Sequence, residues 1–146
     1  MPTGTTSQQV ADSIGSGLAR AVVVARIDGS LTDLNNPLEQ DCSLELFTGD
    51  TPEGHDTLLH STAHLMAQAV KELFPAAKVT IGPTIENGFF YDFDVDVPFT
   101  DEVLVKVEQK MKELAKSGQD IVRREMSAGD AVKMFEKMGE PYKVEI

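Results

Sequence analysis

The sequence has 146 residues, of which 13 are Lys or Arg and 24 are Asp or Glu, and its formal net charge is −11. That length fits one ordinary domain or two very small ones, and an apolar fraction of 41% excludes a disordered chain. The single cysteine, Cys42, excludes an internal disulfide. The acidic balance is atypical of proteins that bind phosphate backbones. No apolar run approaches the roughly 20 residues that span a bilayer.

The first third of the chain predicts a helix packed on a small mixed sheet. A Thr-Thr pair suited to cap a helix precedes residues 7–14, and glycines follow them. A β-branched run over 22–27 leads into Asp-Gly, a common hairpin turn, and residues 43–47 suit a further strand. We expect one domain over 1–48, which is thin for an independent core, and a linker of Thr, Gly, Asp and Pro over 49–56.

From residue 57 onward, stretches with helical periodicity alternate with stretches rich in β-branched and aromatic residues. The prediction in chain order is a helix over 57–74, strands over 78–85 and 89–94 joined through an Asn-Gly turn, a helix over 100–117, a strand over 121–126, a helix capped by Ser127 that runs to Met138, and a strand over 142–146. This order indicates an α+β fold.

His60 and His64 are the side chains best suited to carry chemistry. Four residues apart on a predicted helix, they share one face with Cβ atoms roughly 5–6 Å apart, so both imidazoles can converge on one metal ion or one substrate. They are one ligand short of a catalytic zinc site, and His55 in the predicted linker is a poor third ligand. An isolated pair at this spacing is about as often two half-buried histidines without a catalytic task.

Other motifs are less specific when each is taken alone. Ile81-Gly82-Pro83 and the aromatic run before Asp92 indicate a hairpin with an apolar face, and a lysine such as Lys143 is usually solvated. As an ordered set, however, these motifs resemble the editing domain of the bacterial threonyl-tRNA synthetase family. The set is His60-Ser61-Thr62-Ala63-His64, Ile81-Gly82-Pro83, Asn87-Gly88-Phe89-Phe90-Tyr91-Asp92, Arg123-Arg124-Glu125 and Pro141-Tyr142-Lys143.

The segment from Pro2-Thr3-Gly4-Thr5-Thr6 to Phe47 is similar to the small TGS domain that precedes the editing domain in that family. The resemblance therefore implies a β-grasp-like TGS domain over 1–48, incomplete at its start, and the first part of an α+β editing domain over 57–146. In that domain the HxxxH helix packs on an antiparallel sheet beside a cleft. The chain is then expected to be a piece of a longer synthetase, truncated at both ends.

The resemblance also implies the site and its reaction. His60, His64 and Lys143 would be catalytic and Tyr91 would contact the aminoacyl-adenosine end or the attacking water, with no metal ligand among them. The reaction would be hydrolysis of serine from mischarged tRNA(Thr), in support of threonyl-tRNA aminoacylation. Because the family completes its pocket with a Cys and a His further along the chain, deacylation by these residues alone is expected to be incomplete.

Expectations on cofactors and partners follow from the same resemblance. No cofactor is expected here, since ATP, Mg²⁺ and Zn²⁺ belong to the aminoacylation core. The expected partner is the acceptor end of tRNA(Thr), the parent enzyme is expected to be a cytoplasmic homodimer, and no membrane contact is expected. Two alternatives stay open, a stand-alone trans-editing hydrolase and a non-enzymatic RNA-binding module of the TGS type.

Overall fold

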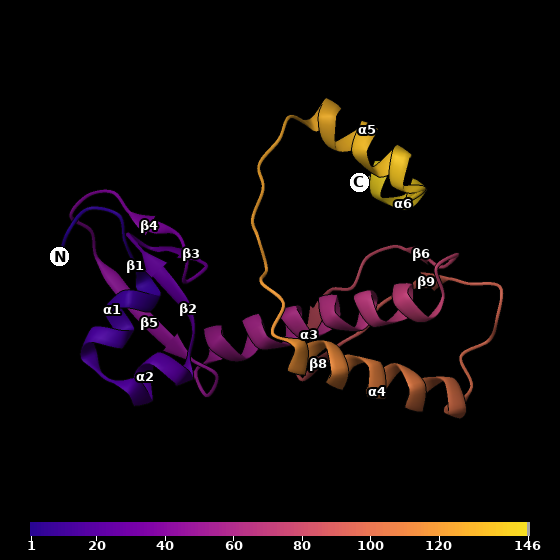
Figure 1. The fold of residues 1–146 in the computed structure, drawn as a ribbon, viewed down its shortest axis with the longest axis horizontal. Coiled ribbons are helices and arrows are strands. Elements are labelled where there is room, and N and C mark those ends of the chain that lie inside the picture. The colour runs from indigo at the N-terminus through magenta and orange to yellow at the C-terminus, as the bar shows by residue number, and fades with distance from the viewer. Residues whose placement is uncertain (146) are drawn as a thin grey trace. The chain divides into compact units, whose positions relative to one another are not determined.

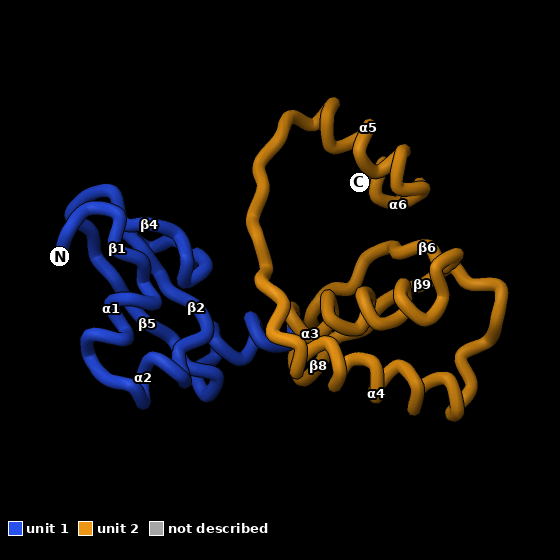
Figure 2. Tube along the Cα trace, in the orientation of Figure 1, with its two compact units in different colours: residues 1–59 blue, residues 60–146 orange. Residues whose placement is uncertain are grey.

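The computed structural model describes residues 1–145, which divide into two compact units, residues 1–59 and the residues from His60 onward (Figures 1 and 2). The division falls inside one helix, α3, which spans Pro52–Leu73. Helices and antiparallel strand pairs occur in both units, so the predicted α+β class is confirmed. No helix among the described residues is long and apolar enough to cross a membrane.

The first unit places two helices beside short antiparallel strands. Its elements are β1 (Thr5–Thr6), α1 (Ser7–Ile14), α2 (Ser16–Ala21), β2 (Val22–Ile27), β3 (Ser30–Thr32), β4 (Pro37–Leu38) and β5 (Leu44–Thr48). Strand β2 lies between β3 and β5, and β1 pairs with β4. The helix, hairpin and strand predicted here are confirmed, whereas α2, β1 and β4 were not predicted. The prediction of a mixed sheet is wrong, because β2 pairs antiparallel with both β3 and β5.

Local chemistry explains where these elements begin and turn. Thr6 caps α1 in a capping box, because its side chain accepts from the amide of Gln9 while the Gln9 side chain accepts from the amide of Thr6. Asp28 and Gly29 have positive φ angles of 48° and 87°, as the tight turn between β2 and β3 requires. Both features are readable from the sequence.

The second unit is built around α3 and α4, and its core lies where they meet a hairpin. The remaining elements are β6 (Lys78–Val79), β7 (Thr84–Ile85), β8 (Gly88–Phe89), β9 (Phe93–Asp94), α4 (Asp101–Ser117), α5 (Ala128–Met138) and α6 (Pro141–Glu145). Val70, Val107 and Leu114 are buried together, and Phe93 of the hairpin packs against them. The predicted helices over 100–117 and from Ser127 to Met138 are confirmed.

The predicted start of the long helix at residue 57 is wrong. Helix α3 begins at Pro52, and residues 52–56, assigned to a linker from their composition, belong to it. The Thr51 hydroxyl accepts from the amide of Gly54 at 3.2 Å, and Pro52 occupies the first helical position, where its missing N–H costs nothing. The Thr-Pro pair marks a helix start that the surrounding polar residues obscured.

The two strands predicted near the chain end are also wrong. Residues 121–126 have no regular structure, and Ile121 and Val122 are 90% and 83% exposed, because no neighbouring strand is there to pair with them. Residues 141–145 form α6, with Pro141 at its first position and the carbonyl of Glu140 accepting from the amide of Lys143. The last residue of that predicted strand, Ile146, lies outside the described residues.

The predicted hairpin exists, but its strands are short. The ladder near the turn pairs β7 with β8, and a second ladder pairs β6 with β9. Between the ladders, Gly82 and Pro83 interrupt the pairing, because proline has no amide hydrogen to donate.

Candidate functional site

The histidine pair lies on one face of α3, in the second unit. The Nε2 atoms of His60 and His64 are 3.1 Å apart, and their ring centroids are 4.6 Å apart with the rings nearly perpendicular. At that separation one imidazole donates its Nε2 hydrogen and the other accepts it, so the two rings take opposite roles. While the two rings are in contact, this donor and this acceptor satisfy each other.

The surroundings of His64 favour its neutral form. Although its side chain is exposed at the surface, partial desolvation lowers the pKa of His64, and the nearby charges of His60 and Lys143 lower it further. An imidazole with a lowered pKa is neutral at pH 7 and carries a lone pair on one of its ring nitrogens. His64 can therefore accept a proton from water.

Lys143 brings a positive charge to this histidine from α6. Its Nζ donates to the carbonyl oxygen of Thr80 at 2.6 Å, just beyond strand β6. Its charge is one of the causes that lower the pKa of His64. A half-buried ammonium in this place can offset negative charge that develops on a substrate oxygen.

Tyr91 lies on the hairpin, and its ring is packed on both sides. The ring stacks on Phe93 with centroids 4.9 Å apart, and a side chain at Gly82 would overlap it, because a Cβ there would lie 2.0 Å from Cδ2 of Tyr91. Burial, with a smaller effect of Glu140, raises the pKa of Tyr91, so its phenol stays protonated. Within residues 1–145, no hydrogen bond or ring contact joins Tyr91 to either histidine.

An apolar cavity of about 150 Å³ borders Tyr91. Met66 and Val70 of α3 and Leu104 and Val107 of α4 contribute to its walls. Since α3 carries the histidines as well, the cavity and the histidine pair share one supporting helix. Such a wall suits the flat face of a nucleobase or an apolar group rather than a charge.

The sequence analysis missed the buried Glu140, between α5 and α6. The residue is only 5% exposed, and its carboxylate lies 2.5 Å from Nζ of Lys71. The order Gly139-Glu140-Pro141 weakly indicates that one helix ends and another begins there. The burial of Glu140 depends on contacts far along the chain, so the sequence pattern could not show it.

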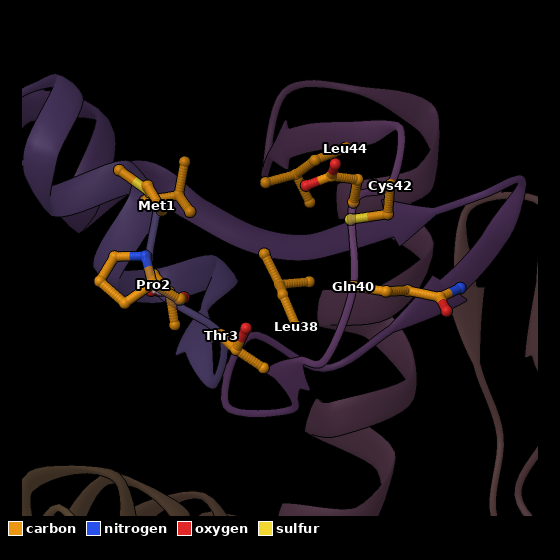
Figure 3. A pocket seen from close by; sticks show the side chains of 10 residues that line it. Met1, Pro2, Thr3, Leu38, Gln40, Cys42 and Leu44 are labelled. Atoms are coloured by element: carbon orange, nitrogen blue, oxygen red, sulfur yellow. Dashed lines mark hydrogen bonds between the residues drawn. The ribbon is translucent and has the colours of Figure 1, made fainter.

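The described residues contain no second pair of histidines. No three of their His, Cys, Asp or Glu side chains are grouped so that they could hold a metal ion. In the first unit, a pocket of about 250 Å³ contains Cys42 but no histidine or lysine (Figure 3). Its lining residues are Met1, Pro2, Thr3, Thr5, Val10, Leu38, Gln40, Asp41, Cys42 and Leu44. The candidate site is therefore the histidine pair with Lys143.

Comparison with known proteins supports the resemblance first seen in the motifs. Residues 1–48 match the model of the TGS domain. The whole chain is 56% identical over 146 residues to the threonine–tRNA ligase of Geobacter sp. (strain M21), and 53% and 47% identical over 145 residues to those of Ralstonia nicotianae and Anoxybacillus flavithermus. The chain spans 23% of the length of each of these ligases. It is therefore similar throughout to one part of a threonine–tRNA ligase.

Proposed function

We propose that this chain is the TGS and editing region of a threonine–tRNA ligase, and that its second unit hydrolyses serine from mischarged tRNA(Thr). The observation that carries the proposal is the histidine pair with Lys143, in a chain 56% identical throughout to such a ligase. We assign no cofactor to this region; ATP, Mg²⁺ and Zn²⁺ would serve the aminoacylation core. The parent enzyme would be a cytoplasmic homodimer.

The selection problem explains why such a ligase would need a second site. Serine lacks one methyl group of threonine, and a pocket that accepts threonine gains only about 1–3 kcal/mol from that methyl. Binding alone therefore admits serine too often. A separate hydrolytic site that tolerates serine and misplaces the threonine methyl removes the error.

The residues fit the chemistry of ester hydrolysis. Water attacks the ester carbonyl carbon, the bond to the ribose oxygen breaks, and the ribose oxygen takes up a proton. His64, held neutral, can accept the proton of the attacking water and return it to the leaving oxygen. Lys143 can offset the charge that develops on the carbonyl oxygen, while Tyr91 and its apolar cavity receive the aminoacyl-adenosine end.

The test is deacylation of Ser-tRNA(Thr) by the ligase that contains this chain. His64→Ala is expected to lower the deacylation rate by about 10²-fold or more, as loss of a general base does. Threonine aminoacylation should stay unchanged, which shows that the enzyme is folded. His55→Ala, an exposed histidine of the first unit, is the matched control. An unchanged deacylation rate in the His64 variant would contradict the proposal.

The pH dependence of the deacylation rate is a second test of His64 as the proton acceptor. An imidazolium cannot accept a proton, so the deacylation rate should fall as the pH drops through the lowered pKa of His64, below the ordinary value near 6.5. In Lys143→Met the acid limb of the pH profile should shift to higher pH, because a cation that disfavours the imidazolium has been removed and the pKa of His64 rises. An acid limb that stays in place would argue against a proton-accepting role for His64.

Two other outcomes would favour other functions. Rapid turnover of Ser-tRNA(Thr) by the 146-residue chain alone would favour a hydrolase complete in itself. Salt-dependent tRNA binding without hydrolysis of any aminoacyl ester would favour an RNA-binding module.

A further inference from the structure

The corner between α5 and α6 is attached to the rest of the second unit through a buried carboxylate. One oxygen of Glu140 lies 2.5 Å from Nζ of Lys71 on α3, and the other accepts from the amide of Val79 on β6 at 3.1 Å. Lys71 also donates to the carbonyl of Ala77 at 2.8 Å. A single side chain therefore joins the corner to both a helix and a strand.

The attachment of this corner depends on polar contacts. Neither α5 nor α6 contributes a buried residue to the core, and five residues are too few for a helix to be stable by itself. The other hydrogen bonds run from Lys78 Nζ to the carbonyl of Gly139 at 2.8 Å, from Tyr142 Oη to Asp94 at 3.1 Å and from Lys143 Nζ to the carbonyl of Thr80 at 2.6 Å. Of these contacts, the pair of Glu140 and Lys71 is the ion pair with a buried carboxylate.

The buried carboxylate of Glu140 stays charged because of its partners. Desolvation by itself would raise the pKa of Glu140, but Lys71 and the Val79 amide outweigh it, so the pKa is lowered and the carboxylate stays charged. Replacing such a pair by apolar residues often leaves stability unchanged or increased. What the pair supplies beyond stability is one fixed position for the corner.

The same corner holds Lys143. Its amide donates to the carbonyl of Glu140 at 3.1 Å, and its Nζ donates to the carbonyl of Thr80, the neighbour of Val79. On α3, Lys71 follows His64 by almost two helical turns, so both lie on the same face of the helix. The face that carries the histidine therefore also anchors the segment that carries the lysine.

We propose that Glu140 is a positioning residue, whose ion pair with Lys71 fixes the α5–α6 corner so that the ammonium of Lys143 stands beside His64. The catalytic meaning of this arrangement rests on the proposed deacylation function, whereas the arrangement itself does not. Without the carboxylate, the corner loses its contacts with Lys71 and Val79, and Lys143 is no longer held in one position beside the histidine.

The first test measures the pKa of the His64 ring by NMR titration of the chain. Lys143→Met is expected to raise this pKa, because a nearby cation is lost, and Glu140→Ala is expected to raise it as well. Simple loss of an anion would have the opposite effect and lower the pKa of a histidine, so the sign separates positioning from direct electrostatics. Glu136→Gln, an exposed glutamate on α5, is the control and should change nothing.

A double variant tests whether the effect of Glu140 passes through Lys143. Adding Glu140→Ala to Lys143→Met should shift the His64 pKa little further. Glu140→Gln keeps the size of the side chain and an acceptor for Val79, so it serves if the alanine variant fails to fold. The proposal is overturned if either Lys143→Met or both Glu140 variants leave the pKa of His64 unchanged, or if the two substitutions shift it additively.

The deacylation kinetics of the ligase test the functional effect of Glu140. A misplacement of about 1 Å can cost about 10²-fold, so Glu140→Ala is expected to lower kcat by up to that factor with a smaller change in KM. A fall in kcat no larger than that of Glu136→Gln would contradict a positioning role. If the unmodified ligase does not deacylate Ser-tRNA(Thr), the proposed function fails, while the NMR titration still decides the role of Glu140.

Discussion

Gly82 shows how one missing side chain positions the ring of Tyr91. A Cβ at this position would lie 2.0 Å from the ring of Tyr91, far inside van der Waals contact. Tyr91 in turn stacks on Phe93, which packs against the core of the second unit. The glycine therefore sets where the tyrosine ring lies.

Gly82→Ala is expected to displace Tyr91 and to destabilise the second unit by about 1–3 kcal/mol, the usual cost of overpacking. Urea unfolding measures the stability, and the NMR shifts of the Tyr91 ring report its displacement. Gly88→Ala is the matched control on the same hairpin, since nothing lies within 4 Å of its added Cβ. Equal stabilities for the two variants would contradict the assignment of Gly82 as a spacer.

At this scale the sequence predicted the part of the site that depends on local geometry. A spacing of four residues on a helix brings His60 and His64 together, and the structure shows that contact. The place of Lys143 came from a family resemblance, and Glu140 was not foreseen. Their positions depend on the path of the chain after α4, which local periodicity does not encode. The chemical roles of these residues stay predictions.

The starts of α1, α4 and α5 were predicted from sequence, because capping is local, whereas the start of α3 was not. Thr6, Thr100 and Ser127 each accept a backbone hydrogen bond at the start of a predicted helix. Strands were predicted less accurately, since a strand needs a neighbouring strand to pair with, and only the tertiary fold supplies it. The ladders of the hairpin are two residues long, and residues 121–126 pair with no strand in the part of the chain that the structure describes.

Ser127 caps the start of α5. Its hydroxyl accepts from the amide of Asp130 at 3.2 Å, and α5 has no buried residue. Ser127→Ala should therefore destabilise α5 by about 1 kcal/mol and speed amide hydrogen exchange over 128–138, with little change in α4. Ser61→Ala, an exposed site in the middle of α3, should leave exchange in α5 unchanged. Unchanged exchange over 128–138 in the Ser127 variant would show that tertiary contacts, rather than the cap, stabilise α5.

For the whole molecule, the central observation is that each unit has its own buried residues. In the first unit they include Ala11, Val24 and Ala25, and in the second Val70 and Val107. The composition of the sequence allowed one domain or two very small ones, and the structure shows two compact units. With separate cores, damage to one core should remain in its own unit.

Matched valine substitutions test this separation. Val70 is 1% exposed and Val24 is 6% exposed, and cutting either to alanine removes methyl groups worth about 0.8 kcal/mol each and leaves a cavity. A loss of about 2 kcal/mol is expected in each case. Val70→Ala should speed amide exchange in α4 and the second half of α3 but not in β2 and β5, and Val24→Ala should do the reverse. If Val70→Ala sped exchange in β2 and β5 as much as in α4, the units would unfold as one. Cooperative unfolding would then have to pass through α3, the helix in which the division falls, and substitutions near Leu59 would be the next to examine.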